Sequence, residues 1–280
     1  MPMLELQADR CTGCGLCVAD CPRKILELRE GRPVLAPERE ASCFRCLHCF
    51  AVCPGGAISI HGNHPEASRP LAGSFPDPEA LETLVQGRRS VRRYRDENLD
   101  PALVQRLLDV AIQAPTAVNA RSVRFTVIDD REVMAAFRGE VMAALGRMVR
   151  EGRLPETHAM YGDFVRLWEE EGVDVLFRGA PHLLVASAAA DAPAPLVDGF
   201  IALATFDLLA QAHGVGTVWD GLAKRAFVEL LPETRVRLGL PEDHVLVYAM
   251  AFGPAAVRYA RTVHHPADIH RVGTAGAGPA

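Results

Sequence analysis

The sequence predicts an α+β protein of two domains, and three observations lead to that prediction. All eight cysteines lie between residues 11 and 53 of the 280-residue chain. Residues 61–78 contain four prolines and two glycines without apolar periodicity, which is typical of a linker. Beyond this segment, helical patterns of period 3.6 alternate with short apolar runs. We therefore expect a first domain over residues 1–62, a linker over 63–79 and a second domain over 80–280.

The composition is that of an ordinary globular protein, and it excludes several classes. Hydrophobic residues make up 49% of the chain and charged residues 23%, and the net charge of −5 provides no basic field for nucleic acid. The longest runs without charge, such as 183–190 and 245–254, are much shorter than the ~20 residues that cross a bilayer. No secretory signal pattern opens the chain. We expect a cytoplasmic protein with reduced thiols, no membrane span and no nucleic-acid partner.

The cysteines form one motif that occurs twice, 32 residues apart, with the spacing Cys-x2-Cys-x2-Cys-x3-Cys-Pro. The first copy contains Cys11, Cys14, Cys17 and Cys21, and the second contains Cys43, Cys46, Cys49 and Cys53. This spacing is typical of [4Fe–4S] clusters, in which the fourth cysteine of each run ligates the other cluster. The predicted ligand sets are Cys11, Cys14, Cys17 and Cys53 for one cluster, and Cys43, Cys46, Cys49 and Cys21 for the other.

Disulfides and structural zinc are the alternatives for these cysteines. A chain without an export signal stays in a reducing compartment, and structural zinc usually takes separated pairs of cysteines. Gly13 and Gly15 would let the first loop fold closely around inorganic sulfide. Residues 24–28 and 56–60, which follow the two motifs, are both strand candidates. We therefore favour iron–sulfur clusters in two pseudo-symmetric halves, with the clusters serving as the core of a small domain.

Residues 1–62 resemble the bacterial ferredoxins that carry two [4Fe–4S] clusters. The resemblance rests on all eight cysteines and on the proline after each motif. It implies a ferredoxin-like double-cluster domain that transfers electrons. His48 lies inside the second motif, but four cysteines already complete that ligand set, so we expect it to be a solvated loop residue.

The second domain gives helix and strand signals in turn. A helix begins near Pro78, and another opens with Asp100 and Pro101 and stops before Pro115. The remaining predicted elements are strands over 123–128, 183–189, 215–219 and 245–252, and helices within 131–168 and before Gly214. The last eight residues, 273–280, are predicted to be disordered.

Four arginines within six residues form the main candidate binding site of the second domain. Arg88, Arg89, Arg92 and Arg93 flank Ser90. Guanidinium groups bind a phosphate dianion through paired hydrogen bonds, and a serine hydroxyl suits a ribityl or ring oxygen. A solvated basic face and a nucleic-acid patch are the alternatives for these residues. The chain contains no Gly-x-Gly-x-x-Gly motif and no P-loop, so a Rossmann-type dinucleotide domain is not expected.

Four segments of the second domain, in their order along the chain, resemble the FMN-binding segments of the nitroreductase family. They are residues 88–94, 114–125, 215–223 and 249–263. The resemblance spans about residues 80–265 and implies a nitroreductase-type α+β sandwich that forms a homodimer with FMN at the subunit interface. The resemblance implies that Arg88, Arg89 and Ser90 contact phosphate, ribityl and ring oxygens, and that Arg92 faces the pyrimidine edge. Pro115, Thr116 and Asn119 would line the isoalloxazine, and the backbone of Asp220 and Gly221 would lie near N5. Either Arg258 or Arg261 would contact the phosphate.

One departure from the family pattern follows the asparagine motif. Family members often have Gln-Pro there, whereas this chain has Arg121 and Ser122. A cation at this position would border the substrate face and favour an anionic or electron-deficient substrate. A surface salt bridge is the alternative role for Arg121.

The two resemblances together imply an iron–sulfur flavoprotein oxidoreductase. Each cluster transfers single electrons, whereas a flavin accepts electrons singly and releases a pair as hydride. The chain would take electrons from a redox donor, a reduced ferredoxin-type protein or NAD(P)H, and reduce a small-molecule acceptor such as a nitroaromatic, a quinone or an activated alkene. The alternatives are an NAD(P)H-oxidising flavoenzyme that exports electrons through its clusters, and a non-enzymatic electron carrier or redox sensor. No catalytic protein acid is predicted.

Overall fold

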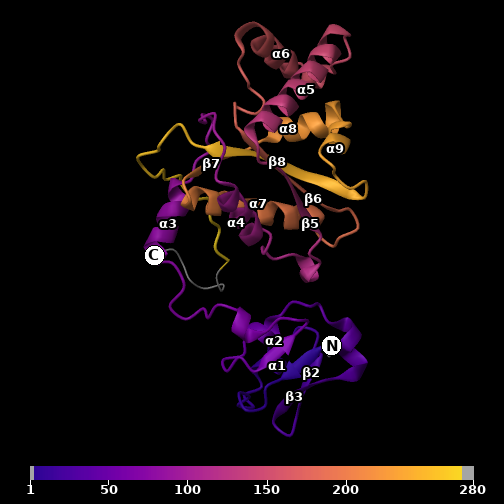
Figure 1. Cartoon of the computed structure of the whole chain (residues 1–280), viewed down its shortest axis with the longest axis vertical. Coiled ribbons are helices and arrows are strands. Elements are labelled where there is room, and N and C mark those ends of the chain that lie inside the picture. Colours follow the sequence, from indigo (N-terminus) through magenta and orange to yellow (C-terminus); the bar gives the residue numbers. More distant parts are fainter. Residues whose placement is uncertain (1–2, 273–280) are drawn as a thin grey trace.

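The computed structural model describes residues 3–272, and it confirms the α+β fold class. A small N-terminal domain contains two sheets of two strands each, and a larger domain is built around one sheet of four strands. Figure 1 shows the two parts joined by the extended segment that precedes α3. The predicted disordered tail, 273–280, lies outside the described residues.

The N-terminal domain has two antiparallel strand pairs and two short helices. The first pair is β1 (Leu4–Leu6) with β4 (Ile58–Ile60), and the second is β2 (Leu26–Arg29) with β3 (Arg32–Leu35). The helices are α1 (Leu16–Ala19) and α2 (His48–Ala51), and they carry Cys17 and Cys49 at equivalent positions of the repeat. Strands β2 and β4 overlap the two predicted strand segments, so the internal repeat is visible in the fold.

The cysteine loops use left-handed backbone at equivalent positions of the repeat. Gly13 and Gly15 have φ angles of 71° and 74°, and Arg45 and Leu47, 32 residues later, have φ angles of 53° and 60°. Gly13 is also needed for space, because a Cβ there would lie 2.7 Å from the carbonyl oxygen of Gly31. The first loop thus uses glycine where the second loop holds larger residues in a costly conformation.

The second domain is organised on a four-stranded antiparallel sheet in the order β5-β6-β8-β7. Its strands are β5 (Val123–Ile128), β6 (His182–Ala189), β7 (Val215–Trp219) and β8 (His244–Pro254). Each lies within two residues of its predicted segment, because continuous apolar runs mark buried strands. Strands β5 and β7 are the opposite edges of the sheet, separated by three strand spacings, or about 14 Å.

Helices cover both faces of this sheet. They are α3 (Pro78–Gly87), α4 (Pro101–Ala111), α5 (Arg131–Arg150), α6 (Met160–Glu171), α7 (Pro195–Ala212), α8 (Gly221–Arg225) and α9 (Thr234–Arg237). Shorter turns are the 3-10 segments Pro37–Ser42, Pro65–Ala67, Ala117–Asn119 and Glu156–His158, and a π-helical turn at Ala226–Leu230. Side chains alternate along β6: Leu183 and Val185 pack with α5 and α6, whereas Leu184 and Ala186 pack with α4 and α7.

Among the described residues, α7 is the one helix that is long and apolar enough to cross a membrane by length and composition. It lies against α4 and strands β6, β7 and β8, and it buries two carboxylates, Asp198 and Asp207. Helices inside the core of a fold meet the same criteria. The buried face of α7 therefore packs across the sheet, whereas its first turns leave Leu196, Val197, Phe200 and Ile201 exposed.

Gly199 lets α7 cross β8 at short range. A Cβ on Gly199 would lie 2.6 to 2.9 Å from side-chain atoms of Val247. We expect Gly199→Ala to lower the free energy of unfolding of the second domain by about 1–3 kcal/mol, the usual cost of overpacking. Thermal denaturation followed by circular dichroism measures this change.

Gly139→Ala is the matched control, because a Cβ on Gly139, inside α5, would meet nothing within 4 Å. That variant should gain up to about 1 kcal/mol, since alanine is the better helix former. Adding Val247→Ala to Gly199→Ala should restore stability. Equal losses in the two single alanine variants would contradict the explanation by close approach.

Candidate functional site

The eight cysteines line two cavities of the N-terminal domain. One cavity is lined by Cys11, Cys14, Cys17 and Cys53, and the other by Cys21, Cys43, Cys46 and Cys49. These are the two sets that crossed ligation predicts, and all eight side chains are free thiols. The two cavities are small and equal in volume, about 20 Å³ each.

Backbone amides donate hydrogen bonds to three of the cysteine sulfur atoms. The bonds are from Ile25 N to Cys21 Sγ at 3.4 Å, from Arg45 N to Cys43 Sγ at 3.3 Å, and from Ala57 N to Cys53 Sγ at 3.2 Å. Such donors stabilise the negative charge of thiolate ligands. The cavities therefore fit a group that binds thiolates.

Whereas the amide donors favour the thiolate form, burial disfavours it and raises the pKa of two buried thiols. It raises the pKa of Cys17, and it raises the pKa of Cys49 to about 11. These thiols must lose a proton when they bind iron. Within residues 3–272, no three His, Cys, Asp or Glu side chains converge on a point that would hold a single metal ion. A cubane does not need such convergence, because each of its cysteines binds a different iron atom.

The basic segment that follows α3 is tied to β7. Ser90 forms a bridge with Thr217, and the amide of Val91 donates to the carbonyl of Thr217 at 2.7 Å. Gly216 permits this approach, because a Cβ there would lie 2.8 to 2.9 Å from the side chain of Val91. The hydroxyl of Tyr259 donates to the carbonyl of Ser90 at 3.2 Å. The arginine cluster and the C-terminal segment therefore meet at the β7 edge of the sheet.

Asp207, in α7, lies beneath the basic segment, and its carboxylate accepts several hydrogen bonds. Its carboxylate is 3% exposed and accepts from Trp219 Nε1 at 3.0 Å and from Thr217 Oγ1. The guanidinium of Arg88 lies 3.3 Å from the same carboxylate. Arg89 donates through Nη1 to the carbonyl of Arg88 at 2.6 Å, while its Nη2 is buried without a partner. A buried guanidinium donor without a partner is the feature that a bound anion would satisfy.

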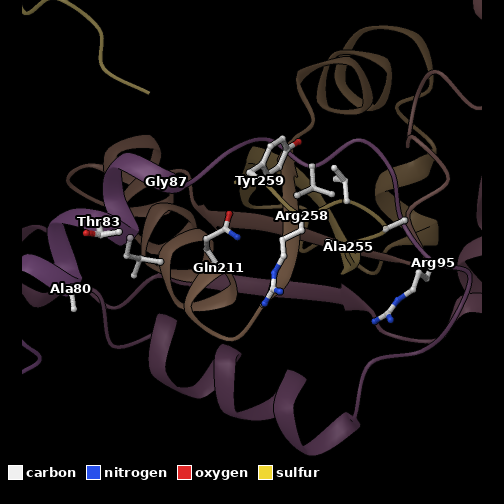
Figure 2. Close-up of a pocket in the computed structure, with 13 residues that line it drawn as sticks. Ala80, Thr83, Gly87, Arg95, Gln211, Ala255, Arg258 and Tyr259 are labelled. Carbon is white, nitrogen blue, oxygen red and sulfur yellow. The ribbon is translucent and has the colours of Figure 1, made fainter. Parts of the chain in front are cut away.

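An open cavity lies beside the arginine cluster, between α3, the end of α7 and residues 255–259 (Figure 2). Its volume is about 810 Å³. Arg95 and Arg258 line it, and no carboxylate is among its lining residues. Gln211 also lines it, and the Oε1 atom of Gln211 is buried without a partner. Both C-terminal candidates are exposed, but Arg258 lines this cavity and Arg261 does not, so the arrangement favours Arg258.

Asp220 turns its side chain into the protein at the end of β7. Its Oδ1 accepts from the amide of Ala223 at 2.8 Å as the N-cap of α8, and its Oδ2 is buried without a partner. The amide of Asp220 donates to the carbonyl of Ala249 at 2.9 Å. Gly221 approaches Tyr248 so closely that a Cβ would lie 2.6 Å from the tyrosine hydroxyl. These contacts fix the backbone at the position where the resemblance assigns it to N5.

The predicted ring-lining residues lie in the loop between α4 and β5. Pro115, Thr116 and Asn119 line an open cleft between the two domains. The side-chain amide of Asn119 donates to the carbonyls of Phe44 and Arg45, both at 3.0 Å. The loop that carries Asn119 is therefore bound to the second cysteine loop.

Within one chain, the predicted flavin-binding residues therefore lie in two separate groups. Arg88, Arg89 and Ser90 lie at the β7 edge, and Arg92 beside them is exposed. The loop over 115–121 precedes β5, the opposite edge. The cavity that holds Arg258 and the cleft that holds Asn119 share no lining residue.

Arg121 lines the same cleft as Pro115, Thr116 and Asn119. Its guanidinium also donates to the carbonyl of Ile112 at 3.0 Å, to the carbonyl of Ala114 at 3.3 Å and to Oε1 of Gln113 at 3.1 Å. These groups lie just after α4, where a cation satisfies carbonyls that the helix leaves free. Arg121 therefore stabilises the end of α4, and its expected place beside the substrate stays a prediction.

Asp207 and Tyr259 belong to this site but were not predicted from the sequence. Asp207 is one of two charged residues in the apolar helix α7, and a lone carboxylate in such a helix signals a buried partner. Tyr259 has no comparable signal, because its contact with Ser90 depends on how the C-terminal segment returns to the sheet.

Asp220 should make stability fall as the pH rises. Burial raises its pKa to about 7 from the ordinary value of 3.8, so the folded chain binds a proton more tightly than the unfolded chain. The free energy of unfolding therefore decreases as the pH rises between these two values. Asp220→Asn removes this loss and keeps an N-cap for α8. The stability of the variant relative to the wild type should grow by about 2 kcal/mol from pH 5 to pH 8.

Asp130→Asn is the control for this measurement. Asp130 caps α5, but hydrogen bonds from the backbone amide of Val133 lower its pKa. Its variant should not gain stability relative to the wild type between pH 5 and pH 8. Thermal denaturation at both pH values measures the two effects, and a pH-independent difference for Asp220→Asn would contradict the assignment.

Comparison with known proteins assigns each domain to a family. Residues 85–254 match the nitroreductase family model, and residues 10–58 match a 4Fe-4S dicluster domain. A 4-nitrobenzoate reductase from Nocardioides sp. is 24% identical over 237 residues, which cover 73% of this chain and 94% of that protein. A ferredoxin from Pyrobaculum islandicum is 46% identical over 55 residues, 19% of this chain and 49% of that protein.

A solved structure gives the same result for the second domain. The crystal structure of a nitroreductase with bound FMN from Desulfitobacterium hafniense is 28% identical, with a TM-score of 0.54. The match covers 69% of this chain and 97% of that protein. The chain therefore belongs to the nitroreductase family and carries a 4Fe-4S dicluster ferredoxin domain at its N-terminus.

Proposed function

We propose that this nitroreductase-family oxidoreductase passes electrons from two [4Fe–4S] clusters to FMN and reduces a small organic acceptor by two electrons. One observation carries the proposal. Cys46 lines both the second cysteine cavity and the cleft between the domains, where Pro115, Thr116 and Asn119 also lie. A redox centre bound to Cys46 would therefore lie beside the loop that the resemblance assigns to the flavin.

The two cysteine sets would hold the clusters. Cys11, Cys14, Cys17 and Cys53 would ligate the first cluster, and Cys21, Cys43, Cys46 and Cys49 the second. The cavities of similar size and the amide donors support this assignment. The clusters supply one-electron transfer. A cytoplasmic location is part of the proposal, because such thiols stay reduced there.

The chain's own residues would bind and orient FMN. Arg88 is held in place by Asp207 and would meet the phosphate end of the cofactor together with Arg89, Ser90 and Arg258. Arg92 would place positive charge at the pyrimidine edge. The backbone of Asp220 and Gly221 would lie near N5. When bound, FMN supplies the exchange between single electrons and an electron pair.

A homodimer is part of the proposal. The two groups of predicted flavin residues lie at opposite edges of the sheet, so a second copy is needed to bring both to one flavin. Helix α7 also exposes a row of large apolar side chains near its start, namely Leu196, Val197, Phe200 and Ile201. Unpartnered apolar surface of this kind is typical of an interface between subunits.

The acceptor would be a nitroaromatic, a quinone or an activated alkene. The relative from Nocardioides sp. is named for the reduction of 4-nitrobenzoate, which supports the nitroaromatic class. Electrons would come from a reduced ferredoxin-type protein through the N-terminal domain. Protons for the product would come from water.

Anaerobic stopped-flow spectroscopy tests the direction of electron flow. Mixing the holoenzyme with a reduced ferredoxin should bleach the cluster absorption first and the flavin absorption afterwards. Rapid flavin bleaching by NADH or NADPH, with reduced ferredoxin inactive, would instead identify an NAD(P)H oxidase that exports electrons. Two clusters without FMN, even after reconstitution, would identify an electron carrier.

Arg258 and Arg261 form a matched pair for testing the phosphate site. Arg258→Ala should weaken FMN binding about 10- to 100-fold, the loss expected for a charge-assisted hydrogen bond. Arg261→Ala should change the Kd less than threefold, because Arg261 lies outside the cavity. Fluorescence titration of the flavin-free protein measures both. A larger loss for Arg261→Ala would show that the other arginine contacts the phosphate.

A further inference from the structure

We propose that the second cluster of each chain reduces the flavin whose phosphate is bound by the partner chain, so that electrons cross the dimer interface. This inference rests on the proposed function, because it takes both clusters, FMN and the homodimer as present. It goes beyond that function by naming which cluster hands over the electrons and to which subunit.

The second cluster is the one that faces the other domain. Cys46 lines the cleft between the domains, whereas none of Cys11, Cys14, Cys17 and Cys53 does. Electrons would therefore enter at the first cluster, where Cys14 is exposed, and leave through the second.

The second cysteine loop, through which electrons would leave, is hydrogen-bonded to the α4–β5 loop of the same chain. One side-chain amide, that of Asn119, donates to two carbonyls of the second cysteine loop, those of Phe44 and Arg45. The left-handed backbone at Val118 and Asn119, with φ angles of 47° and 57°, aims that amide at them. The amide of Ala117 donates to Oδ1 of Asp198 at 2.9 Å, which fixes the loop to α7. The second cluster therefore stays beside this loop.

The phosphate-binding group of the same chain lies far from this loop. Strands β5 and β7 are opposite edges of the sheet, about 14 Å apart. The two edges are also offset along the strand direction. Through Ala188 of β6, Val123 of β5 lies level with Val245 of β8. Thr217 of β7, which bridges to Ser90, pairs with Phe252 of β8. Seven residues of strand add roughly 23 Å, so the start of β5 and Ser90 are separated by more than 20 Å.

Figure 1 shows the same separation. The N-terminal domain lies below the sheet, β5 is the nearer of the two edge strands, and β7 lies higher, on the flank of the second domain beside α3. Electron transfer slows exponentially with distance, so the cluster serves the flavin at the α4–β5 loop. That flavin must be bound through its phosphate by a second copy of the chain.

The surface around the loop fits a second copy of this chain. Val118 is 52% exposed, and the neighbouring first turns of α7 expose Leu196, Val197, Phe200 and Ile201 by 36% to 58%. The hydrogen bond from Ala117 to Asp198 holds the loop against the first turns of α7. Val118 and the exposed side chains of α7 therefore form one apolar patch. We place the second copy on this patch, next to the loop that carries Asn119.

The electrons balance without any change in protein bonds. Two molecules of reduced ferredoxin would each give one electron, which would enter through the cysteine set of Cys14 and leave through the set of Cys46. Two such electrons and two protons from solvent would account for the reduction of one FMN.

Heterodimers with separated defects test this route. Chain X carries Cys46→Ala, which removes a ligand of the second cluster, and chain Y carries Arg89→Ala with Arg258→Ala, which weakens its phosphate site. Co-expression with two different tags isolates the X–Y dimer. It should bind one FMN, held by X, and that FMN should be bleached by reduced ferredoxin at the wild-type rate, because the intact second cluster of Y lies beside it.

A second heterodimer is the matched control. One chain carries all three substitutions and the other is wild type, so the single FMN is bound by the wild-type chain but faces a defective cluster. Bleaching in this dimer should be at least tenfold slower than in the X–Y dimer and should equal the rate of the Cys46→Ala homodimer. Iron content and circular dichroism verify that all chains are folded.

The reverse order of the two rates would show transfer within one chain and would overturn the inference. Equal rates, or a monomeric protein with fully bound FMN, would overturn it as well. The two rate outcomes leave the proposed function intact if the wild-type clusters reduce the flavin rapidly, whereas a monomeric protein would also remove the homodimer from it. Failure of the wild-type protein to do so would instead reject the proposed function.

Discussion

The hydrogen bonds from one asparagine amide determine how the two domains can work together. Asn119 donates to the carbonyls of Phe44 and Arg45, so the loop before β5 and the second cysteine loop share a cleft. Without this contact the ferredoxin domain would be tethered only by a Pro- and Gly-rich segment, which leaves the distance between redox centres undefined. The proposed electron transfer needs a short and constant distance, and the hydrogen bonds of Asn119 hold the loop of Cys46 beside the α4–β5 loop.

The local features of this protein could be predicted from its sequence. Spacing alone gave the two cysteine sets, because three ligands on one tight loop and a fourth from the other repeat leave few arrangements. Strands such as Val123–Ile128 and Val215–Trp219 were predicted to the residue, since short apolar runs between helices indicate buried strands. The α+β class followed from the alternation of these runs with helical patterns.

The relation between distant segments could not be predicted in the same way. Residues 88–92 and 115–119 are close in sequence, yet they lie at opposite edges of the sheet, because the strand order β5-β6-β8-β7 is a property of the whole fold. The hydrogen bonds of Arg121 were not predicted for a related reason, since most of its partners are carbonyls at the end of α4. Asp207 was missed because its three donors come together only after α7 lies across β7.

The unequal loops of the repeat suggest that its copies have diverged in their tasks. Gly13 and Gly15 in the first copy form an unstrained thiolate cage, and their counterparts Arg45 and Leu47 adopt the same backbone less easily. Both of the larger residues line the cleft between the domains. The second copy of the repeat thus has a less favourable backbone conformation, but its larger side chains provide a contact surface. Exchanging the two copies would preserve every iron ligand and yet leave the flavoprotein half without a docking site.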